Sequence, residues 1–101
     1  MEYNNSNQIT MVSVERIDKG LKISYRPMLE TLYYCPGIKI NETPQNIEIS
    51  FVRCDIKNTC PVTLKANHAA EQGIDYITIE NNNKPVFAKF KDSTLRLSAE
   101  N

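Results

Sequence analysis

The stretch Ile47-Glu48-Ile49-Ser50-Phe51 alternates apolar and polar side chains at every position. Successive side chains of a β-strand point to opposite faces, so the three apolar residues are predicted to face a core and the other two to face solvent. A helix would instead repeat its apolar residues every three or four positions. This stretch therefore predicts a half-buried strand, and the same pattern recurs along the chain.

Short runs with period two follow one another, separated by turn residues such as Asp18-Lys19-Gly20 and Cys35-Pro36-Gly37. Residues 29–34 fit either a short strand or a single helical turn, and residues 67–73 fit one or two helical turns at most. Strands are predicted at residues 9–17, 21–26, 38–40, 47–51, 62–66, 76–80, 86–90 and 95–98.

Eight or nine short strands, spaced about ten residues apart, are typical of an all-β sandwich or small barrel. No stretch is long enough for the helix of a parallel crossover, so we expect antiparallel pairing. We predict an antiparallel two-sheet sandwich of immunoglobulin-like architecture, without the Trp and wide cysteine spacing of antibody domains. A small closed β-barrel is the alternative. Residues 1–8 are predicted to be a flexible arm and residues 9–101 a single domain.

The charge balance narrows the range of partners. Twelve basic and twelve acidic residues give a formal net charge of zero. Nucleic-acid binders and polybasic membrane-surface proteins normally carry a basic surplus, so neither class is favoured. No apolar run approaches the roughly 20 residues of a membrane span, and we expect no membrane insertion. The first eight residues lack signal-peptide features, which fits a cytosolic protein or one whose targeting segment has been removed.

The three cysteines are the most informative single residues. Cys54 and Cys60 lie at the end of one predicted strand and before the next, so a hairpin would bring them within disulfide distance. Two free, partly buried thiols or metal ligation are the other interpretations. A disulfide would indicate a periplasmic or secreted protein, although a cytoplasmic one is not excluded. Cys35 fits a small buried apolar residue better than an intermolecular bridge or a reactive thiol.

No motif for catalysis or cofactor binding is present. A zinc set of Cys35, Cys54, Cys60 and His68 would have gaps unlike the close ligand pairs of structural zinc sites. His68, the only histidine, is expected in a surface loop. No nucleophile turn and no glycine-rich phosphate loop occur. We therefore expect neither catalysis nor a cofactor.

Two features remain as a possible interaction surface. Phe87 is predicted to lie with Lys89 and Lys91 on the outer face of a strand, and Tyr33 and Tyr34 form an aromatic pair. The hypothesis is a non-catalytic, extracytoplasmic module that binds another protein or its own copies. The alternative is a small barrel that binds single-stranded nucleic acid or an oligosaccharide on its strand face.

Overall fold

The computed structural model describes residues 1–99. Within them the backbone forms eleven short strands, one 3₁₀ helix and no α-helix. The elements are η1 (Ser6–Gln8), β1 (Ile9–Ile17), β2 (Gly20–Pro27), β3 (Tyr33–Tyr34), β4 (Gly37–Glu42), β5 (Ile47–Phe51), β6 (Cys54–Asp55), β7 (Leu64–Lys65), β8 (Asn67–His68), β9 (Asp75–Glu80), β10 (Val86–Lys89) and β11 (Thr94–Leu97).

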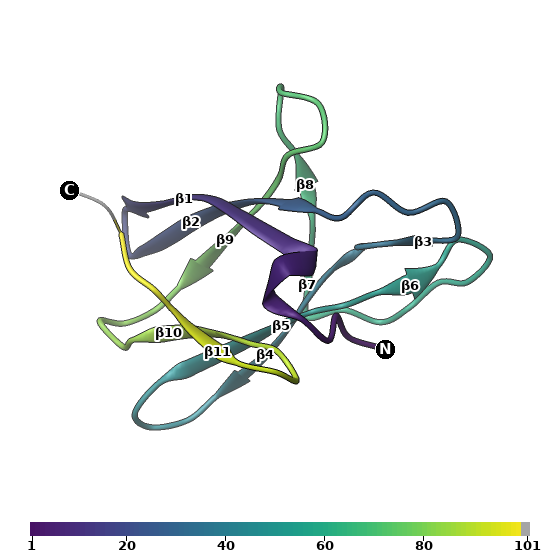
Figure 1. The fold of residues 1–101 in the computed structure, drawn as a ribbon. Coiled ribbons are helices and arrows are strands. Elements are labelled where there is room, and N and C mark those ends of the chain that lie inside the picture. Colours follow the sequence, from purple (N-terminus) through teal and green to yellow (C-terminus); the bar gives the residue numbers. More distant parts are fainter. Residues whose placement is uncertain (100–101) are drawn as a thin grey trace.

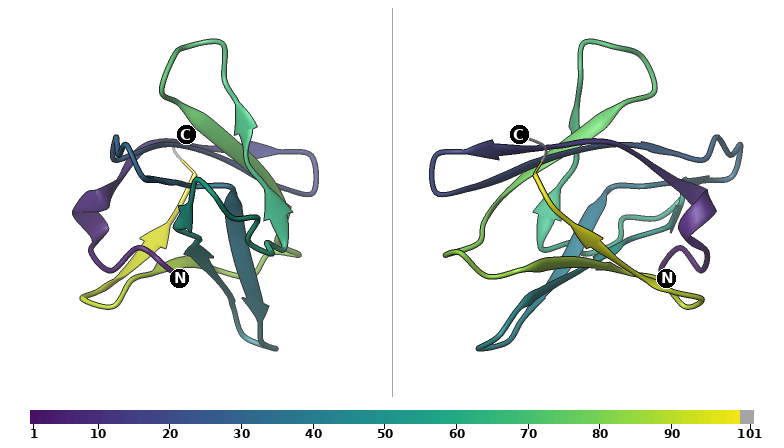
Figure 2. Two further views of the ribbon diagram at one scale, coloured as in Figure 1. Left: turned by 90° about the vertical axis from the view of Figure 1, so that its right-hand side faces the viewer. Right: turned by 60° about the vertical axis from the view of Figure 1, so that its left-hand side comes forward.

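The strands form two layers. A four-stranded sheet has the order β1-β2-β9-β8, and a five-stranded sheet has the order β11-β10-β5-β4-β7. Figures 1 and 2 show β1, β2 and β9 above, facing β4, β5, β10 and β11 below. Strands β3 and β6 pair only with each other and extend beyond one end of the layers (Figure 1). The predicted two-sheet β-sandwich is confirmed.

The core lies between the two sheets. Alternate side chains of β2 and β5 point inward, and Ile23, Tyr25, Ile49 and Phe51 are buried completely or almost completely. The rings of Tyr25 and Phe51 meet edge to face with centroids 4.7 Å apart, and Phe90 stacks on Phe51 at 6.1 Å. The alternation read from residues 47–51 is therefore correct, because each apolar residue of β5 faces the opposite sheet.

One strand pair corrects the expectation of antiparallel pairing. β10 runs parallel to β5, with Val86 beside Ile47 and Ala88 beside Ile49. A parallel pair needs a long connection but not a helix, and here the chain from β5 to β10 passes through β9 of the other sheet. The sheets of immunoglobulin-like domains are antiparallel, and the immunoglobulin-like architecture therefore stays a prediction.

The segments whose sequence has no clear hydrophobic period differ most from the predicted secondary structure. Residues 28–32 form neither strand nor helix, and the strand predicted at 62–66 is reduced to β7. The expected helical turn at residues 67–73 is absent, because Asn67 and His68 pair with β9 as strand β8. The following loop turns at Gly73, whose φ of 85° is a left-handed conformation that glycine adopts without strain.

The N-terminal residues differ from the flexible arm that the sequence indicated. Tyr3 belongs to the core and donates its backbone N–H to the carbonyl of Phe51 at 3.2 Å. Glu2 forms an isolated antiparallel bridge with Val52. The segment continues β-pairing past the end of β5 and buries an aromatic ring there. Composition does not reveal this, since the partner lies about 50 residues away in the chain.

Candidate functional site

The predicted disulfide between Cys54 and Cys60 is present and joins Cα atoms 6.0 Å apart. Cys54 is buried in β6, directly opposite Tyr34 of β3. The Tyr34 hydroxyl donates a hydrogen bond to the carbonyl of Asn58, which lies inside the ring that the disulfide closes, at 3.4 Å. The disulfide therefore ties the loop after β6 to the small β3–β6 sheet.

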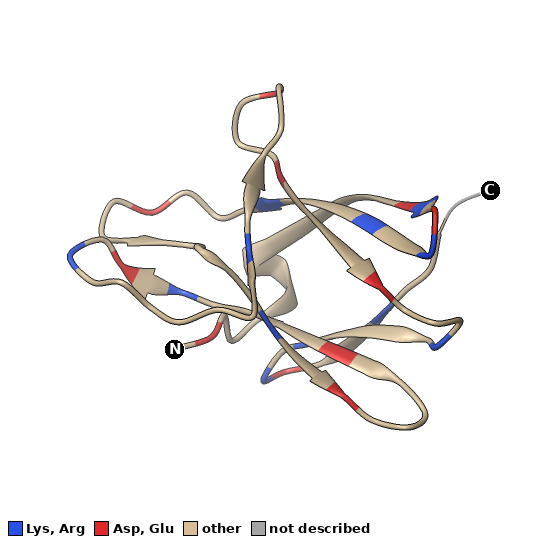
Figure 3. Cartoon of the chain, turned by 180° about the vertical axis from the view of Figure 1, so that it is seen from behind, with Lys and Arg blue, Asp and Glu red and all other residues tan. Residues whose placement is uncertain are grey.

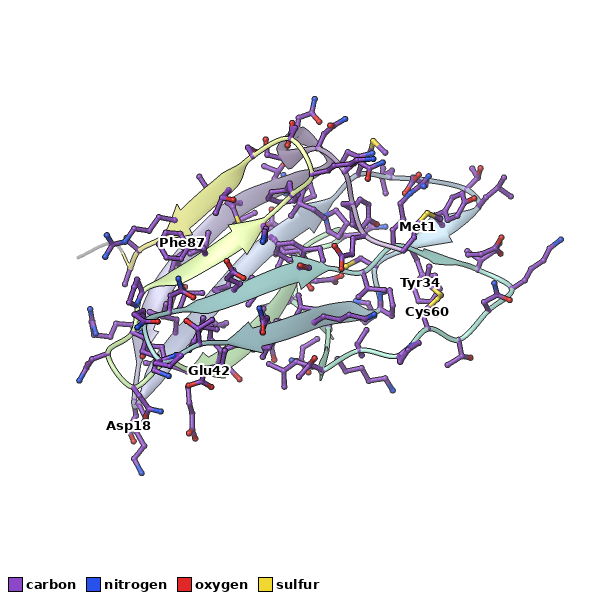
Figure 4. All side chains as sticks on the ribbon, turned by 90° about the horizontal axis from the view of Figure 1, so that it is seen from below. Met1, Asp18, Tyr34, Glu42, Cys60 and Phe87 are labelled. Carbon is purple, nitrogen blue, oxygen red and sulfur yellow. A yellow bond between two sulfur atoms is a disulfide. The ribbon has the colours of Figure 1, made fainter. Side chains whose placement is uncertain are left out.

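Large apolar side chains are exposed around this small sheet. Leu29 is 93% exposed, and Figure 4 shows Met1, Tyr34 and Cys60 close together at one end of the molecule. Backbone hydrogen bonds join the segments, from Ile56 N–H to the Leu32 carbonyl at 3.0 Å and from Arg53 N–H to the Met1 carbonyl at 2.7 Å. We call this surface the apolar end, and its members are Met1, Met28, Leu29, Leu32, Tyr34 and Ile56.

A groove of about 500 Å³ borders the apolar end. Residues 27–30 and 33–35 form one side, residues 68–69 and 71–75 form the other, and Tyr3 also lines it. The second side is the loop that rises above the sandwich between β8 and β9 in Figure 1. The groove thus lies between the segment that leads into β3 and the loop between β8 and β9.

The charged residues that line the groove are carboxylates, apart from His68. Glu30, Glu71 and Asp75 line it, and no Lys or Arg does. Figure 3, seen from behind, shows acidic positions in red on the loop that rises above the sandwich and at its base. Asp75 lies at the start of β9 with its side chain 13% exposed, and its Oδ1 is 2.8 Å from Nδ1 of His68, which is itself 89% exposed.

Arg53 holds Glu30 in place from the neighbouring segment. Its Nε donates to both carboxylate oxygens of Glu30 at 3.1 Å, and its guanidinium carbon lies 3.8 Å from the centre of the Tyr33 ring. Hydrogen bonding to Glu30 raises the pKa of Arg53 above its ordinary value. The charge of Glu30 is therefore compensated within the molecule.

The inner wall of the groove carries neutral polar groups. Cys35 is buried, and its thiol donates to the carbonyl of Gly37 at 3.5 Å. Burial raises the pKa of Cys35 to about 12, so the thiol stays protonated at neutral pH. Tyr3 also lines the groove, whereas Tyr25 lies in the core near Cys35. The hydroxyls of both tyrosines are buried without a hydrogen-bond partner among residues 1–99, and burial raises the pKa of both.

The two features predicted from sequence lie apart. Tyr33 and Tyr34 line the groove, whereas Phe87, Lys89 and Lys91 belong to the five-stranded sheet and its following turn. Figure 4 places Phe87 and Tyr34 toward opposite ends of the molecule. Phe87 is half-buried, although its neighbours Val86 and Ala88 point inward as expected.

Sequence reasoning missed Met28, Leu29 and Leu32 as site residues. They lie in a segment with no period, so the sequence assigned them to an ambiguous strand or helical turn. An apolar cluster without periodicity, next to Tyr33 and Tyr34, was the signal that could have indicated a surface patch.

Cys54 and Cys60 are bonded to each other, so the four-ligand zinc set cannot form. No group of three His, Cys, Asp or Glu side chains within residues 1–99 is placed to hold a metal ion. No helix in the same range is both long and apolar enough to cross a membrane. Comparison with protein-family models, with curated proteins and with solved structures found no match to the chain.

Proposed function

We propose that this protein is a non-catalytic interaction module that docks another protein, or a further copy of itself, through the apolar end. The observation that supports this is the distribution of exposed large apolar side chains. Six of the nine among the described residues belong to the apolar end, and the other three are Val12, Ile17 and Leu95. Contiguous exposed apolar surface bordered by polar residues is typical of protein-binding sites.

The disulfide supports an extracytoplasmic location for this module. Disulfides persist in oxidising compartments and are rare as structural bonds in the cytosol. Cys54–Cys60 supports the docking surface directly, because it fixes the loop that carries Ile56 against β3. We therefore propose a periplasmic or secreted protein whose binding surface is stabilised by oxidation.

Site-specific photocrosslinking tests the proposal. p-Benzoylphenylalanine replaces Leu29 in one variant and Leu95 in a matched control, since both side chains are exposed and belong to different parts of the molecule. In cells of the source organism we expect a discrete adduct from position 29 and none from position 95. Purified protein alone reveals whether the adduct is a second copy. Absence of any adduct from position 29, or the same adducts from both positions, would contradict docking at the apolar end.

A second candidate function belongs to the outer face of the five-stranded sheet. Lys39, Lys89 and Lys91 line a depression of about 630 Å³ there together with Glu2 and Glu48. Three cations in one depression are compatible with binding a single-stranded nucleic acid or an anionic oligosaccharide. Fluorescence anisotropy with a labelled single-stranded oligonucleotide at low salt tests this, and no binding there would exclude the nucleic-acid version.

A further inference from the structure

We propose that the groove beside the apolar end selects a partner segment in which a Lys or Arg side chain lies next to apolar residues. This inference rests on the proposed docking function and specifies the chemistry of the partner. Two features of the groove carry it: its carboxylates without a Lys or Arg partner and its apolar rim.

The first feature is the charge of the groove. Of its three carboxylates only Glu30 is neutralised within the molecule, by Arg53. Glu71 and Asp75 form no ion pair with a Lys or Arg among residues 1–99. Arg26 lies beside the same loop, with its Nε 3.9 Å from the position that a Cβ of Gly73 would take, but it pairs with neither carboxylate and does not line the groove. A cation entering the groove would meet these two carboxylates, whereas an anion would be repelled by both. Charge complementarity therefore favours a cationic partner group.

The environment of Asp75 strengthens this preference. Its side chain is mostly buried, and the contact with His68 is the one side-chain hydrogen bond that its carboxylate makes in the described part of the chain. A buried carboxylate is costly unless it is paired and hydrogen-bonded. Asp75 lines the groove, so an ammonium or guanidinium group that enters it approaches the same carboxylate.

The rim of the groove accounts for the apolar part of the partner. Met28 and Leu29 line the groove and are exposed, so both lose contact with water when a chain lies over them. The methylene stem of Lys or Arg can lie along such a surface while its charged end reaches the carboxylates. A side chain with an aliphatic stem and a cationic end thus matches both parts of the groove.

Three capped tripeptides test the preference: acetyl-Leu-Lys-Leu-amide, acetyl-Leu-Gln-Leu-amide and acetyl-Leu-Glu-Leu-amide. Each is titrated into ¹⁵N-labelled protein and followed by amide chemical shifts. We expect the lysine peptide to shift residues 28–34 and 68–75 and to bind at least about tenfold more tightly than the glutamate peptide, which corresponds to about 1.4 kcal/mol. The affinity of the glutamine peptide should lie between those of the other two.

Two variants locate the preference. Glu71→Gln lies on an exposed loop and should preserve the fold, and Asp75→Asn keeps the size of the buried side chain. We expect the double variant to bind the lysine peptide less than about threefold more tightly than the glutamate peptide. Glu80→Gln is the matched control, because it removes an exposed carboxylate at the other end of β9. That variant should leave the ratio unchanged.

The outcomes separate this inference from the docking function. Equal affinities for the three peptides, or a preference that survives in Glu71→Gln/Asp75→Asn, would overturn the cationic partner. Shifts confined to residues outside the groove, or no shifts with any peptide, would overturn it too. An adduct at position 29 together with any of these results would retain docking at the apolar end and reject only the partner chemistry.

Discussion

The Tyr25 hydroxyl is the clearest single group whose removal should not harm the fold. The residue is fully buried, and its hydroxyl has no hydrogen-bond partner among residues 1–99. A buried polar group without a partner costs roughly 1–3 kcal/mol. Tyr25→Phe removes the hydroxyl and keeps the ring against Phe51, so we expect the free energy of unfolding to stay constant or rise by about 1 kcal/mol.

Urea denaturation measures this change, with Phe51→Ala as the control. That control removes the ring that Tyr25 contacts and should lower the free energy of unfolding by about 3–5 kcal/mol. If Tyr25→Phe lowered it by more than about 1 kcal/mol, the hydroxyl would have to be bonded in solution, for example to the Cys35 thiol nearby.

Among the elements, the β3–β6 sheet depends most on a covalent bond. It contains four residues, and the disulfide closes the loop that follows it. The loop-entropy relation gives about 2 kcal/mol for a ring of this size, so Cys54→Ser/Cys60→Ser should lower the free energy of unfolding by about that amount. Hydrogen exchange should accelerate at Tyr34 and residues 54–60, while β2 and β5 stay protected. Uniform acceleration in all strands would contradict this local role.

Strand β1 is the one long edge strand, and a bulge interrupts it. The pairing with β2 shifts between Met11 and Ser13, which leaves Val12 as an extra, exposed residue. Bulges twist an edge and make it a poorer template for another chain. Deletion of Val12 would restore a continuous ladder, with Met11 opposite Tyr25 and the next residue opposite Ser24.

We therefore expect the Val12 deletion to fold and to self-associate more strongly than the wild type. Sedimentation velocity over a concentration series measures this association. Val12→Lys is the matched control, because it keeps the bulge and adds an edge charge. A deletion variant that sediments as the wild type at every concentration would show that the bulge does not protect the edge.

Some strands of this fold can be predicted from the sequence alone and others cannot. Strict alternation predicted β5 and β10 with the correct inward face, since one face of each meets the core. It also predicted β2, in which Ser24 on the other face is buried as well. The parallel pairing of β5 and β10 was not predictable, because pairing partners depend on how the two sheets pack. β7 and β8 are two residues long, too short for any period to appear.

The candidate site was predictable only in part, for a similar reason. The disulfide follows from cysteine spacing at a strand boundary, and Tyr33 and Tyr34 stand out by residue type. The groove combines residues near 30 with residues near 71, and no local pattern connects them. Tyr3 was assigned to a flexible arm, because its burial depends on contacts distant in sequence.

At the scale of the whole molecule, three weakly acidic groups buried together should make the fold sensitive to alkali. The ordinary pKa is 9.0 for the Cys35 thiol and 10.0 for Tyr3 and Tyr25, and burial raises all three. When the folded-state pKa of an acid is raised, the unfolded state loses its proton first as pH rises. The contribution of these three groups to the free energy of unfolding is fully present below about pH 9. Above that pH it falls by up to about 1.4 kcal/mol per pH unit for each group.

Urea denaturation between pH 7 and pH 11 measures this loss, and the variant Cys35→Ala/Tyr25→Phe separates the contributions. The wild type should lose several kcal/mol of unfolding free energy between about pH 9 and pH 11, whereas the variant retains only the contribution of Tyr3. The variant also removes the one free thiol in the described chain, so attack of that thiol on Cys54–Cys60 cannot mimic the effect. An unfolding free energy that stays constant to pH 11 would mean that these groups ionise in the folded protein as readily as in the unfolded chain.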